Sequence, residues 1–300
     1  MSMHPLKTSF AVTAMVCAFG VQAADRTVIQ NKGSDTLVNV AQAWAEEYQN
    51  VDSNVAIAVS GGGSGTGIAA MINGTVDIAN ASRSMKEKEV EKAKSMGQNP
   101  IEHVVGYDAL AVFVHGDNPN GTLSIEQLAQ IFGRGGKSTT WSDVGAKVPG
   151  CGSDEIVVVS RQNNSGTYAY FRKAVLGAAA KKGVISKGSF RMGTLDMHGS
   201  KDVVDLVEKT PCAIGYSGLA YATDHVKMAC IAKETGGSCV SPSVKTASDR
   251  SYPIARPLFM YTNGEPQGEI KKYMDWILSD VGQCILVKKG YAPAHDVSCG

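Results

Sequence analysis

Two Ser-Gly-Thr tripeptides, residues 64–66 and 165–167, carry the side chains best suited to hold an anion. Each follows a run rich in β-branched residues, 55–60 or 156–161, and precedes residues with helical spacing. A strand, a small-residue turn and a helix start together aim free backbone N–H groups at one place. Serine and threonine hydroxyls add donors, and glycine lets the backbone approach closely. Because the arrangement occurs twice, we expect two loops to hold one oxyanion from opposite sides.

The elements that would position these loops alternate along the chain. The apolar patterns predict strands at residues 27–30, 55–60 and 76–80, on either side of Tyr107-Asp108, and at 156–161, 213–216 and 252–261. Helical spacing predicts helices after residues 33–36 and 64–67, at 86–96, 124–132 and 200–209, after Thr167, and twice within 269–287. Such alternation is typical of an α/β fold with mixed, mostly parallel sheets and helices on both faces.

The first residues have the pattern of a signal peptide. Lys7 supplies a positive charge, residues 10–21 form a short apolar run, and small residues precede a cleavage point after Ala23. We therefore expect residues 1–23 to be removed, with cleavage after Ala24 as the alternative. The apolar run is too short to anchor the chain in a bilayer, and Cys17 lacks a good lipobox before it. The mature protein is thus expected to be soluble and exported.

The charge balance is nearly even, with 29 basic and 28 acidic residues. A nucleic-acid surface would need a basic stripe, so this balance argues against nucleic acid as a partner. The chain contains no Cys-x-x-Cys pair and its six histidines are scattered, so we expect no metal site. An anion site would then be local and built mainly from dipoles.

Six cysteines remain once the signal peptide is removed, and an even number in an exported chain favours disulfides. Six cysteines allow 15 connectivities, which the sequence leaves open. The spacing favours two short loops, Cys230–Cys239 and Cys284–Cys299, and leaves Cys151–Cys212 as the third pair.

Four ordered motifs resemble those of one known family. They are Gly-Ser-Asp-Thr-Leu at 33–37, Gly-Gly-Gly-Ser-Gly-Thr-Gly-Ile at 61–68, Asp-Ile-Ala-Asn-Ala-Ser-Arg at 77–83 and Arg-Gln-Asn-Asn-Ser-Gly-Thr at 161–167. Their order and spacing, with Ala-Ile-Gly-Tyr at 213–216, resemble the phosphate-binding proteins that deliver phosphate to Pst-type ABC importers. The likeness covers nearly all of the mature chain.

This resemblance implies a two-lobe periplasmic binding protein of type II, a venus-flytrap with two crossover strands. It implies a first lobe from residues 24–113 and 222–300 and a second lobe from residues 114–221. It also implies a periplasmic monomer that binds inorganic phosphate (HPO₄²⁻ or H₂PO₄⁻) and passes it to a membrane permease. The family carries no catalytic residues and needs no cofactor.

The motifs transfer the family's ligand contacts to this chain residue by residue. The phosphate-binding residues that the resemblance implies, together with nearby substitutes, are Ser34, Asp35, Thr36, Leu37, Ser64, Gly65, Thr66, Ser82, Arg83, Asp108, Arg161, Ser165, Gly166 and Thr167. Arg161 offers a planar fork for two phosphate oxygens. The alternative for Ser34, Asp35 and Thr36 is that one of them caps the following helix.

Two departures from the family pattern bear on selectivity. Much of the family has an aspartate at Ser82 that accepts the proton of HPO₄²⁻ and repels sulfate. We expect Asp108, or else Asp35, to replace that acceptor, and Arg83 to be a second cation or to pair with one of those acids. The acid that normally holds the arginine is Asn163 here, so we expect Arg161 to have no charged partner. Sulfate, molybdate and tungstate therefore stay as alternative ligands.

A serine hydrolase is the alternative from another class. It would need a Gly-x-Ser-x-Gly elbow, and neither Ser64 nor Ser165 lies in one. A phosphatase would need clustered carboxylates and histidines for metals, which the sequence does not bring together. We therefore expect a binding protein and no enzyme.

Overall fold

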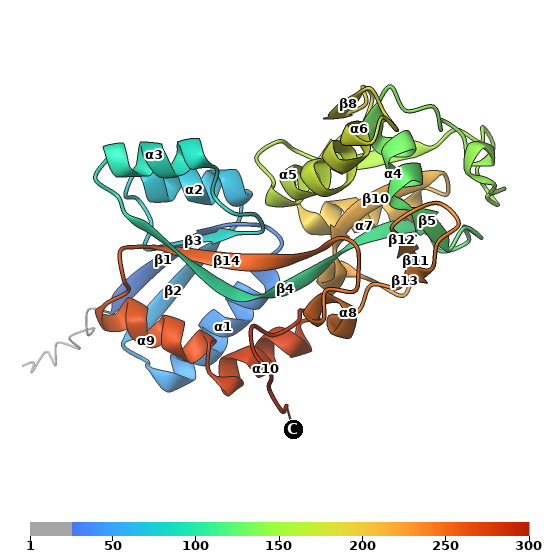
Figure 1. Ribbon diagram of the computed structural model, residues 1–300. Helices are drawn as coiled ribbons and strands as arrows, with labels where there is room; N and C mark the ends of the chain where they lie inside the picture. Colours follow the sequence, from blue (N-terminus) through green and yellow to red (C-terminus); the bar gives the residue numbers. More distant parts are fainter. Residues whose placement is uncertain (1–25, 300) are drawn as a thin grey trace, which may run out of the picture.

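The computed structural model describes residues 26–299, which form two lobes joined by two long strands (Figure 1). The first crossing strand, β4 (Pro100–His115), runs from one lobe into the other, and the second, β14 (Ala255–Asn263), returns beside it. The mixed α/β, two-lobe fold that the sequence predicted is thus confirmed. The predicted signal peptide lies outside the described residues.

The sheet of the first lobe combines parallel and antiparallel ladders. Its strands in spatial order are β2 (Val55–Ser60), β1 (Thr27–Gly33), β3 (Ile78–Ala81), β14 and the first half of β4. The first three run parallel, and β14 is antiparallel to both β3 and β4. This places the carboxyl ends of β1, β2 and β3 at one edge of the sheet, where their loops can share a site.

Helices cover both faces of this sheet (Figure 1). They are α1 (Val38–Val51), α9 (Gly268–Ile277) and α10 (Asp280–Lys288) on one face, and α2 (Ser64–Ile72) and α3 (Glu87–Ser95) on the other. The spacing of Val40, Trp44 and Tyr48 puts all three on the buried side of α1. The indole of Trp44 also donates to the carbonyl of Gly282 at 2.7 Å, which fixes α1 against α10.

The second lobe repeats the layered plan around the other half of β4. Its main strands are β10 (Ala213–Gly218), β7 (Val157–Arg161), β9 (Leu195–Met197) and β11 (Val226–Met228). Smaller sheets contain β5 (Thr122–Ser124), β12 (Cys230–Ala232), β13 (Cys239–Val240), β6 (Gly133–Arg134) and β8 (Lys187–Phe190). Its helices are α4 (Ile125–Phe132), α5 (Gly166–Phe171), α6 (Ala178–Lys181), α7 (Ser200–Lys209) and α8 (Val244–Ser248), with a π-helical segment between α5 and α6.

Strand β4 corrects one expectation. The two short strands predicted around Tyr107-Asp108 are a single strand, whose first part pairs with β14 and whose second part pairs with β10 and β11. An aspartate in an apolar run indicated a break, because a lone carboxylate is seldom buried. The strand continues through Asp108 because Arg256 on β14 lies opposite it and supplies the counter-charge.

The strand pairs after residue 221 bear on where the chain returns to the first lobe. Strand β11 pairs with the second-lobe half of β4, and β12 pairs with β5. The family resemblance implied a boundary after residue 221, whereas these strand pairs connect residues 226–240 to the second-lobe strands. We therefore propose that the second boundary falls at β14, while the division into lobes otherwise stays as predicted.

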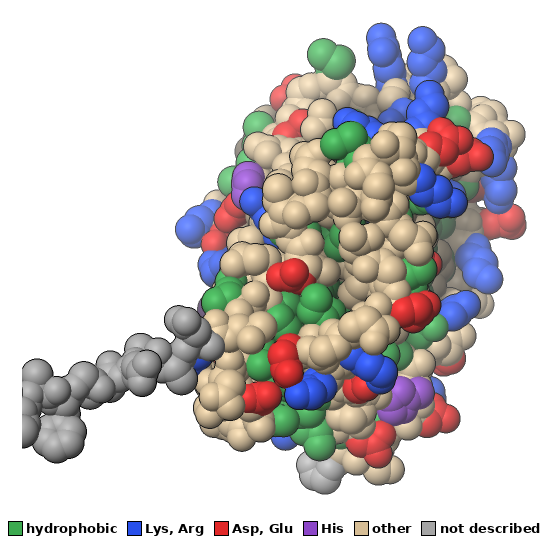
Figure 2. All heavy atoms as spheres, turned by 90° about the vertical axis from the view of Figure 1, so that its left-hand side faces the viewer, with side chains coloured by type: hydrophobic (Ala, Val, Ile, Leu, Met, Phe, Trp, Pro, Cys, Tyr) green, Lys and Arg blue, Asp and Glu red, His purple; other side chains and the backbone are tan. Residues whose placement is uncertain are grey.

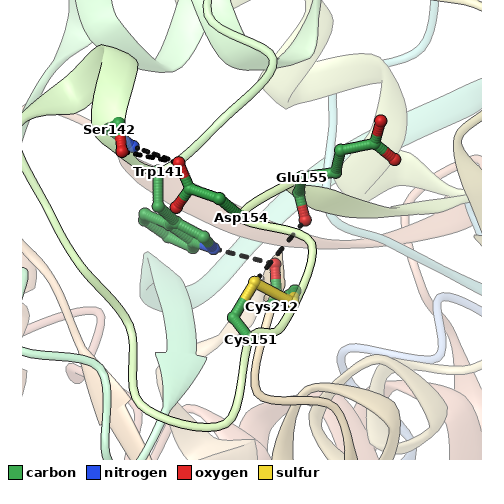
Figure 3. The surroundings of a disulfide bond; sticks show 6 residues. All are labelled: Trp141, Ser142, Cys151, Asp154, Glu155 and Cys212. Atoms are coloured by element: carbon green, nitrogen blue, oxygen red, sulfur yellow. Dashed lines mark hydrogen bonds between the residues drawn. A yellow bond between two sulfur atoms is a disulfide. The ribbon is translucent and has the colours of Figure 1, made fainter.

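The three predicted disulfides are present. Cys151–Cys212, Cys230–Cys239 and Cys284–Cys299 have Cα–Cα distances of 4.9, 5.4 and 5.4 Å. Cys151–Cys212 links a long surface loop to the strand edge beside buried Trp141, whose indole donates to the carbonyl of Cys212 at 3.0 Å (Figure 3). Asp154 fixes the same loop by accepting from the hydroxyl of Ser142 at 2.5 Å.

No helix within residues 26–299 combines the length and the apolar character that a membrane crossing requires.

Candidate functional site

Four loops meet where the lobes face each other. Three belong to the first lobe and follow the parallel strands β1, β2 and β3, at residues 34–37, 61–63 and 82–86. The fourth, residues 162–165, follows β7 of the second lobe and leads into α5. All four of the motifs singled out in the sequence are therefore brought together.

Three hydroxyl groups from three different first-lobe loops form a buried cluster. Ser34 donates from its Oγ to the Oγ of Ser82 at 3.0 Å, and the Oγ of Ser64 lies 3.3 Å from the same atom. The Ser64 hydroxyl also accepts from the amide of Ser82 at 3.0 Å. Each of these side chains is at most 1% exposed, so the cluster is shielded from bulk water.

The start of α5 brings the second lobe against this cluster. A Cβ added at Gly166 would lie 2.2 Å from the Oγ of Ser64 and 2.5 Å from the Oγ of Ser82. Beside it, the Oγ1 atoms of Thr36 and Thr167 lie 2.9 Å apart and join the lobes directly. The glycine at position 166 is thus required by close approach.

Free amide groups accompany these hydroxyls. Within residues 26–299, the backbone N–H groups of Thr36, Ser64 and Gly166 donate no hydrogen bond. Thr36 precedes α1, and Ser64 and Gly166 are the first residues of α2 and α5, where helices leave donors unpaired. Three helix starts from both lobes therefore bring unpaired donors close to the hydroxyl cluster.

Several of the residues predicted to contact the ligand form hydrogen bonds within the loops. The amide of Gly65 donates to the carbonyl of Asn164 at 2.8 Å, and Thr66 donates from its amide and hydroxyl to carbonyls of its own loop. The hydroxyl of Ser165 accepts from the amides that follow it as the cap of α5. The amide of Leu37 donates to the backbone carbonyl of Ser34, and the Leu37 side chain is buried in the first-lobe core.

Arg161 has a charged partner, which the sequence did not indicate. Its Nη2 donates to the Oδ2 of Asp35 at 2.8 Å and to the carbonyl of His198 at 2.7 Å, and its Nη1 donates to the Oγ of Ser200 at 2.8 Å. The expectation that it lacks a charged partner is wrong, because Asp35 replaces the family's acid while Asn163 stays exposed. Burial lowers the pKa of Arg161, and the Asp35 carboxylate opposes that shift.

Asp35 joins three segments through its carboxylate. Its Oδ1 accepts from the amide of Gly62 at 2.8 Å while its Oδ2 accepts from Arg161. The helix-cap alternative fails, because α1 begins after Leu37 without a side-chain cap. Asp35 and Arg161 together fix the first-lobe loops against the second lobe.

Arg83 lies against a different acid from the two that the sequence suggested. Its Nη1 and Nη2 donate to the two carboxylate oxygens of Glu89 at 2.7 and 2.8 Å, and Nη1 also donates to the carbonyl of Ser84. Glu89 in turn accepts from the amide of Lys86 at the start of α3. The expectation that Arg83 pairs with Asp35 or Asp108 is therefore wrong.

Arg256 is the cation that sequence reasoning missed. It lies on the crossing strand β14, is 1% exposed, and donates from Nη2 to the Oγ1 of Thr167 at 3.1 Å and of Thr36 at 3.3 Å. Its Nη1 donates to the carbonyl of Ser82 at 3.3 Å. A single guanidinium therefore reaches residues from both lobes.

Asp108 is the acid beside that guanidinium. Its Oδ2 accepts from Nε and Nη2 of Arg256 at 3.1 and 2.8 Å, and its Oδ1 accepts from the amide of Leu219 at 3.2 Å. Burial raises the pKa of Asp108, while the charge of Arg256 acts in the opposite direction. Both arginines at the site, Arg161 and Arg256, are thus paired with a carboxylate, and the donors around them are neutral.

A cleft of about 970 Å³ lies against this cluster, and its lining includes the buried residues Ser82 and Arg256. In the part of the chain that the structure describes, no group of three or more histidine, cysteine or acidic side chains is arranged to bind a metal. The arrangement is that of a site for a tetrahedral oxyanion, in which donors converge from two lobes.

Comparison with known proteins places this chain among binding proteins. Residues 20–281 match the model of the PBP superfamily domain. The phosphate-binding protein PstS of Pseudomonas aeruginosa is 35% identical over 281 residues, which cover 88% of this chain and 82% of that protein. The protein SphX of Synechococcus elongatus is 31% identical over 283 residues, covering 91% and 80% of the two chains.

Solved structures agree with the sequence relatives. A putative phosphate ABC transporter substrate-binding protein from Clostridium perfringens, solved with bound phosphate, has a TM-score of 0.76 and 28% identity and covers 90% of this chain and all 100% of its own. An ABC-type phosphate transport receptor from Vibrio cholerae has a TM-score of 0.66 at 25% identity, with 88% and 99% of the chains covered. With the four motifs and the two-lobe fold, these likenesses show that the chain belongs to the PstS-like family of phosphate-binding proteins within the PBP superfamily.

Proposed function

We propose that this protein captures inorganic phosphate between its lobes and delivers it to the membrane permease of an ABC importer. The observation that supports this most strongly is the convergence of Thr36, Ser64, Gly166, Thr167 and Arg256 from both lobes. Unpaired amides, hydroxyls and one guanidinium together replace the hydration shell that a dianion loses on burial, a loss that costs tens of kcal/mol when nothing replaces it.

The proposed ligand contacts fall into two groups. The direct contacts are the hydroxyl or amide groups of Thr36, Ser64, Ser82, Gly166 and Thr167 and the guanidinium of Arg256. The residues that hold those groups in place are Ser34, Asp35, Leu37, Gly65, Thr66, Arg161 and Ser165. Arg83 belongs to neither group, because both of its terminal guanidinium nitrogens donate to the carboxylate of Glu89.

Asp108 provides a basis for choosing phosphate over sulfate. Asp108 is wholly buried beside the proposed hydrogen-bond donors. It is an acceptor among groups that otherwise donate hydrogen bonds. A buried carboxylate accepts a hydrogen bond from the P–O–H group of HPO₄²⁻, whereas sulfate at neutral pH has no proton to donate and is repelled. Ser82 has no charge to play that part, which leaves Asp108 as the proposed source of selectivity.

We infer that capture includes a hinge motion at β4 and β14. Contacts between the lobes near the site involve the loops themselves: the carbonyl of Asn164 accepts from the amide of Gly65, and its side-chain amide donates to the carbonyl of Gly62 at 2.9 Å. These bonds form only when the lobes meet. The closed shape would then be recognised by the permease. We further propose a periplasmic monomer that releases its ligand unchanged and does not bind nucleic acid.

Calorimetry on protein stripped of ligand tests the function. We expect tight binding of phosphate and arsenate and much weaker binding of sulfate, molybdate and tungstate. Tighter binding of sulfate, molybdate or tungstate than of phosphate would refute the assignment. So would the absence of binding to any of these anions.

Two matched variants test the site. Arg256→Lys keeps the charge and loses the fork, and we expect its phosphate affinity to fall by about 2–3 kcal/mol because charge-assisted bonds to ligand are lost. Arg161→Lys acts only through loop position and should cost less. A larger loss for Arg161→Lys would instead show that Arg161 contacts the ligand.

A further inference from the structure

The cleft that leads to the site has walls of one charge sign. Five cationic side chains line it, and no carboxylate does so within residues 26–299. The cations are Arg83, Lys86, Arg172, Lys173 and Arg256. The chain as a whole carries 29 basic and 28 acidic residues, so this bias does not follow from an excess of positive charge.

The cations of the cleft differ in whether an acid neutralises them. Arg256 is paired with Asp108 and Arg83 with Glu89, so these two add little net charge to the cleft. Lys86, Arg172 and Lys173 form no ion pair within the described chain. The innermost part of the cleft is therefore nearly neutral, and the uncompensated charge lies nearer its mouth.

These three residues lie on both walls. Lys86 precedes α3 on the first lobe, whereas Arg172 and Lys173 follow α5 on the second (Figure 1). All three are exposed, and the Nε of Arg172 donates to the carbonyl of Gly188 at 3.0 Å, which fixes its guanidinium at the wall. On the end face of the molecule in Figure 2, by contrast, acidic and basic side chains are intermixed over the lower part.

We propose that Lys86, Arg172 and Lys173 form an electrostatic entrance that speeds the capture of anions by a charge-neutral binding pocket. The inference rests on the proposed function, because it concerns the route to that same site. A cleft with low-dielectric walls of one sign concentrates field lines and can raise association rates by about tenfold to a thousandfold. A neutral pocket lined by donors gives affinity and selectivity at short range, but it exerts little attraction on a distant ion.

The test compares two triple variants with the same change in charge. The first is Lys86→Gln, Arg172→Gln and Lys173→Gln. The control is Lys245→Gln on α8 with Lys288→Gln and Lys289→Gln at the end of α10, three exposed positions that do not line the cleft. Stopped-flow fluorescence of the intrinsic tyrosines and tryptophans, with inorganic phosphate as the probe, gives association and dissociation rates.

We expect the cleft variant to associate with phosphate at least about fivefold more slowly than the parent at low ionic strength, about 10 mM, where charges act over long distances. Near 0.5 M salt the three proteins should converge, because the screening length falls to a few ångströms. Dissociation rates should stay within twofold of the parent. The control should follow the parent at every salt concentration.

Other outcomes would overturn the proposal. Equal slowing in the control would assign the effect to net charge, and faster dissociation without slower association would make these residues direct ligands. Unchanged kinetics with reduced uptake in cells would make the same surface a contact for the permease. Equilibrium calorimetry on the parent tests the proposed function separately from the electrostatic entrance. A parent that prefers sulfate to phosphate would refute phosphate capture. The same salt series, repeated with sulfate as the probe, would then still test whether Lys86, Arg172 and Lys173 speed anion association.

Discussion

Arg256 and Asp108 form an ion pair with 2.8 Å between Nη2 and Oδ2, and neither side chain is exposed to solvent. The pair joins the two strands that cross between the lobes, since Arg256 lies on β14 and Asp108 opposite it on β4. A buried pair of this kind contributes little net stability, but removing one partner leaves a buried charge uncompensated. Arg256 thus lies on one of the strands that cross between the lobes, where residues of both lobes contact it.

Replacing Asp108 by Asn should reveal both roles of the carboxylate. The unpaired guanidinium should lower the free energy of unfolding by about 3–5 kcal/mol without ligand. A bound anion should restore part of that loss by replacing the missing charge. Because the acceptor for the phosphate proton is gone, the ratio of phosphate to sulfate affinity should fall at least about tenfold, or ~1.4 kcal/mol.

Urea denaturation and calorimetry with both anions measure these effects. Asp224→Asn, at an exposed position on the second lobe, is the matched control and should change neither quantity. An Asp108→Asn protein that still selects phosphate as the parent does would assign selectivity to another acceptor.

Replacing Gly166 by Ala should weaken ligand binding without unfolding the protein. The new Cβ would collide with the hydroxyls of Ser64 and Ser82 across the lobe contact, at 2.2 and 2.5 Å. The helix α5 should persist, since alanine is a better helix residue than glycine. The lobes can stay apart to relieve the collision, so we expect affinity to fall at least about tenfold while the melting temperature without ligand changes little.

Gly152→Ala is the control for this substitution, because nothing lies within 4 Å of the added Cβ. Small-angle scattering in saturating phosphate should show a more open Gly166→Ala protein. Parental affinity together with a parental closed shape would show that the two loops do not need this close approach.

The loops of the site could be predicted from the sequence because each follows a strand that its own residues define. The strand predicted at 55–60 and the helix that begins at Ser64 both lie where the pattern placed them. Local signals of this kind, a β-branched run followed by glycines and a helical spacing, depend on residues near in the chain. Because β1, β2 and β3 are parallel, the loops that follow them lie at one edge of the sheet, where their serine hydroxyls can meet.

The ion pairs could not be predicted in the same way. Asp35 and Arg161 are 126 residues apart, and Asp108 and Arg256 are 148 residues apart. Nothing local to Arg256 shows which acid will lie opposite it, so the apolar run 252–261 does not by itself place its arginine at the site. A charged residue before Pro257 in an otherwise apolar strand was nevertheless a usable signal, because such a residue is buried only with a partner.

Removal of the Cys151–Cys212 disulfide should destabilise the protein more than removal of Cys230–Cys239. The first closes a sequence separation of 61 residues and the second a separation of 9. In the chain-entropy view these loops are worth about 4 and about 2.5 kcal/mol of unfolding free energy. Urea denaturation of the double alanine variants measures both losses, and equal losses would show that native-state contacts outweigh loop entropy.

The ion pair of Arg83 and Glu89 should make stability depend on pH. Burial acts to raise the pKa of Glu89, but the hydrogen bonds from Arg83 and from the Lys86 amide outweigh it, and the pKa lies below its ordinary value. A carboxyl whose pKa is lowered by folding adds stability above its unfolded pKa, and that stability is lost as pH falls through the folded pKa. Glu89→Gln should therefore be less stable than the parent at pH 7 and should approach it below about pH 4.

Since both side chains are partly exposed, at 10% and 22%, the difference at pH 7 should be about 1 kcal/mol and should shrink with added salt. Chemical denaturation of the two proteins between about pH 3 and pH 7 measures it. Glu91→Gln, at an exposed position of the same helix, controls for the loss of a carboxylate from α3. A deficit that persists unchanged at low pH would mean that Glu89 acts through packing, because a protonated Glu89 can no longer form the charged pair with Arg83.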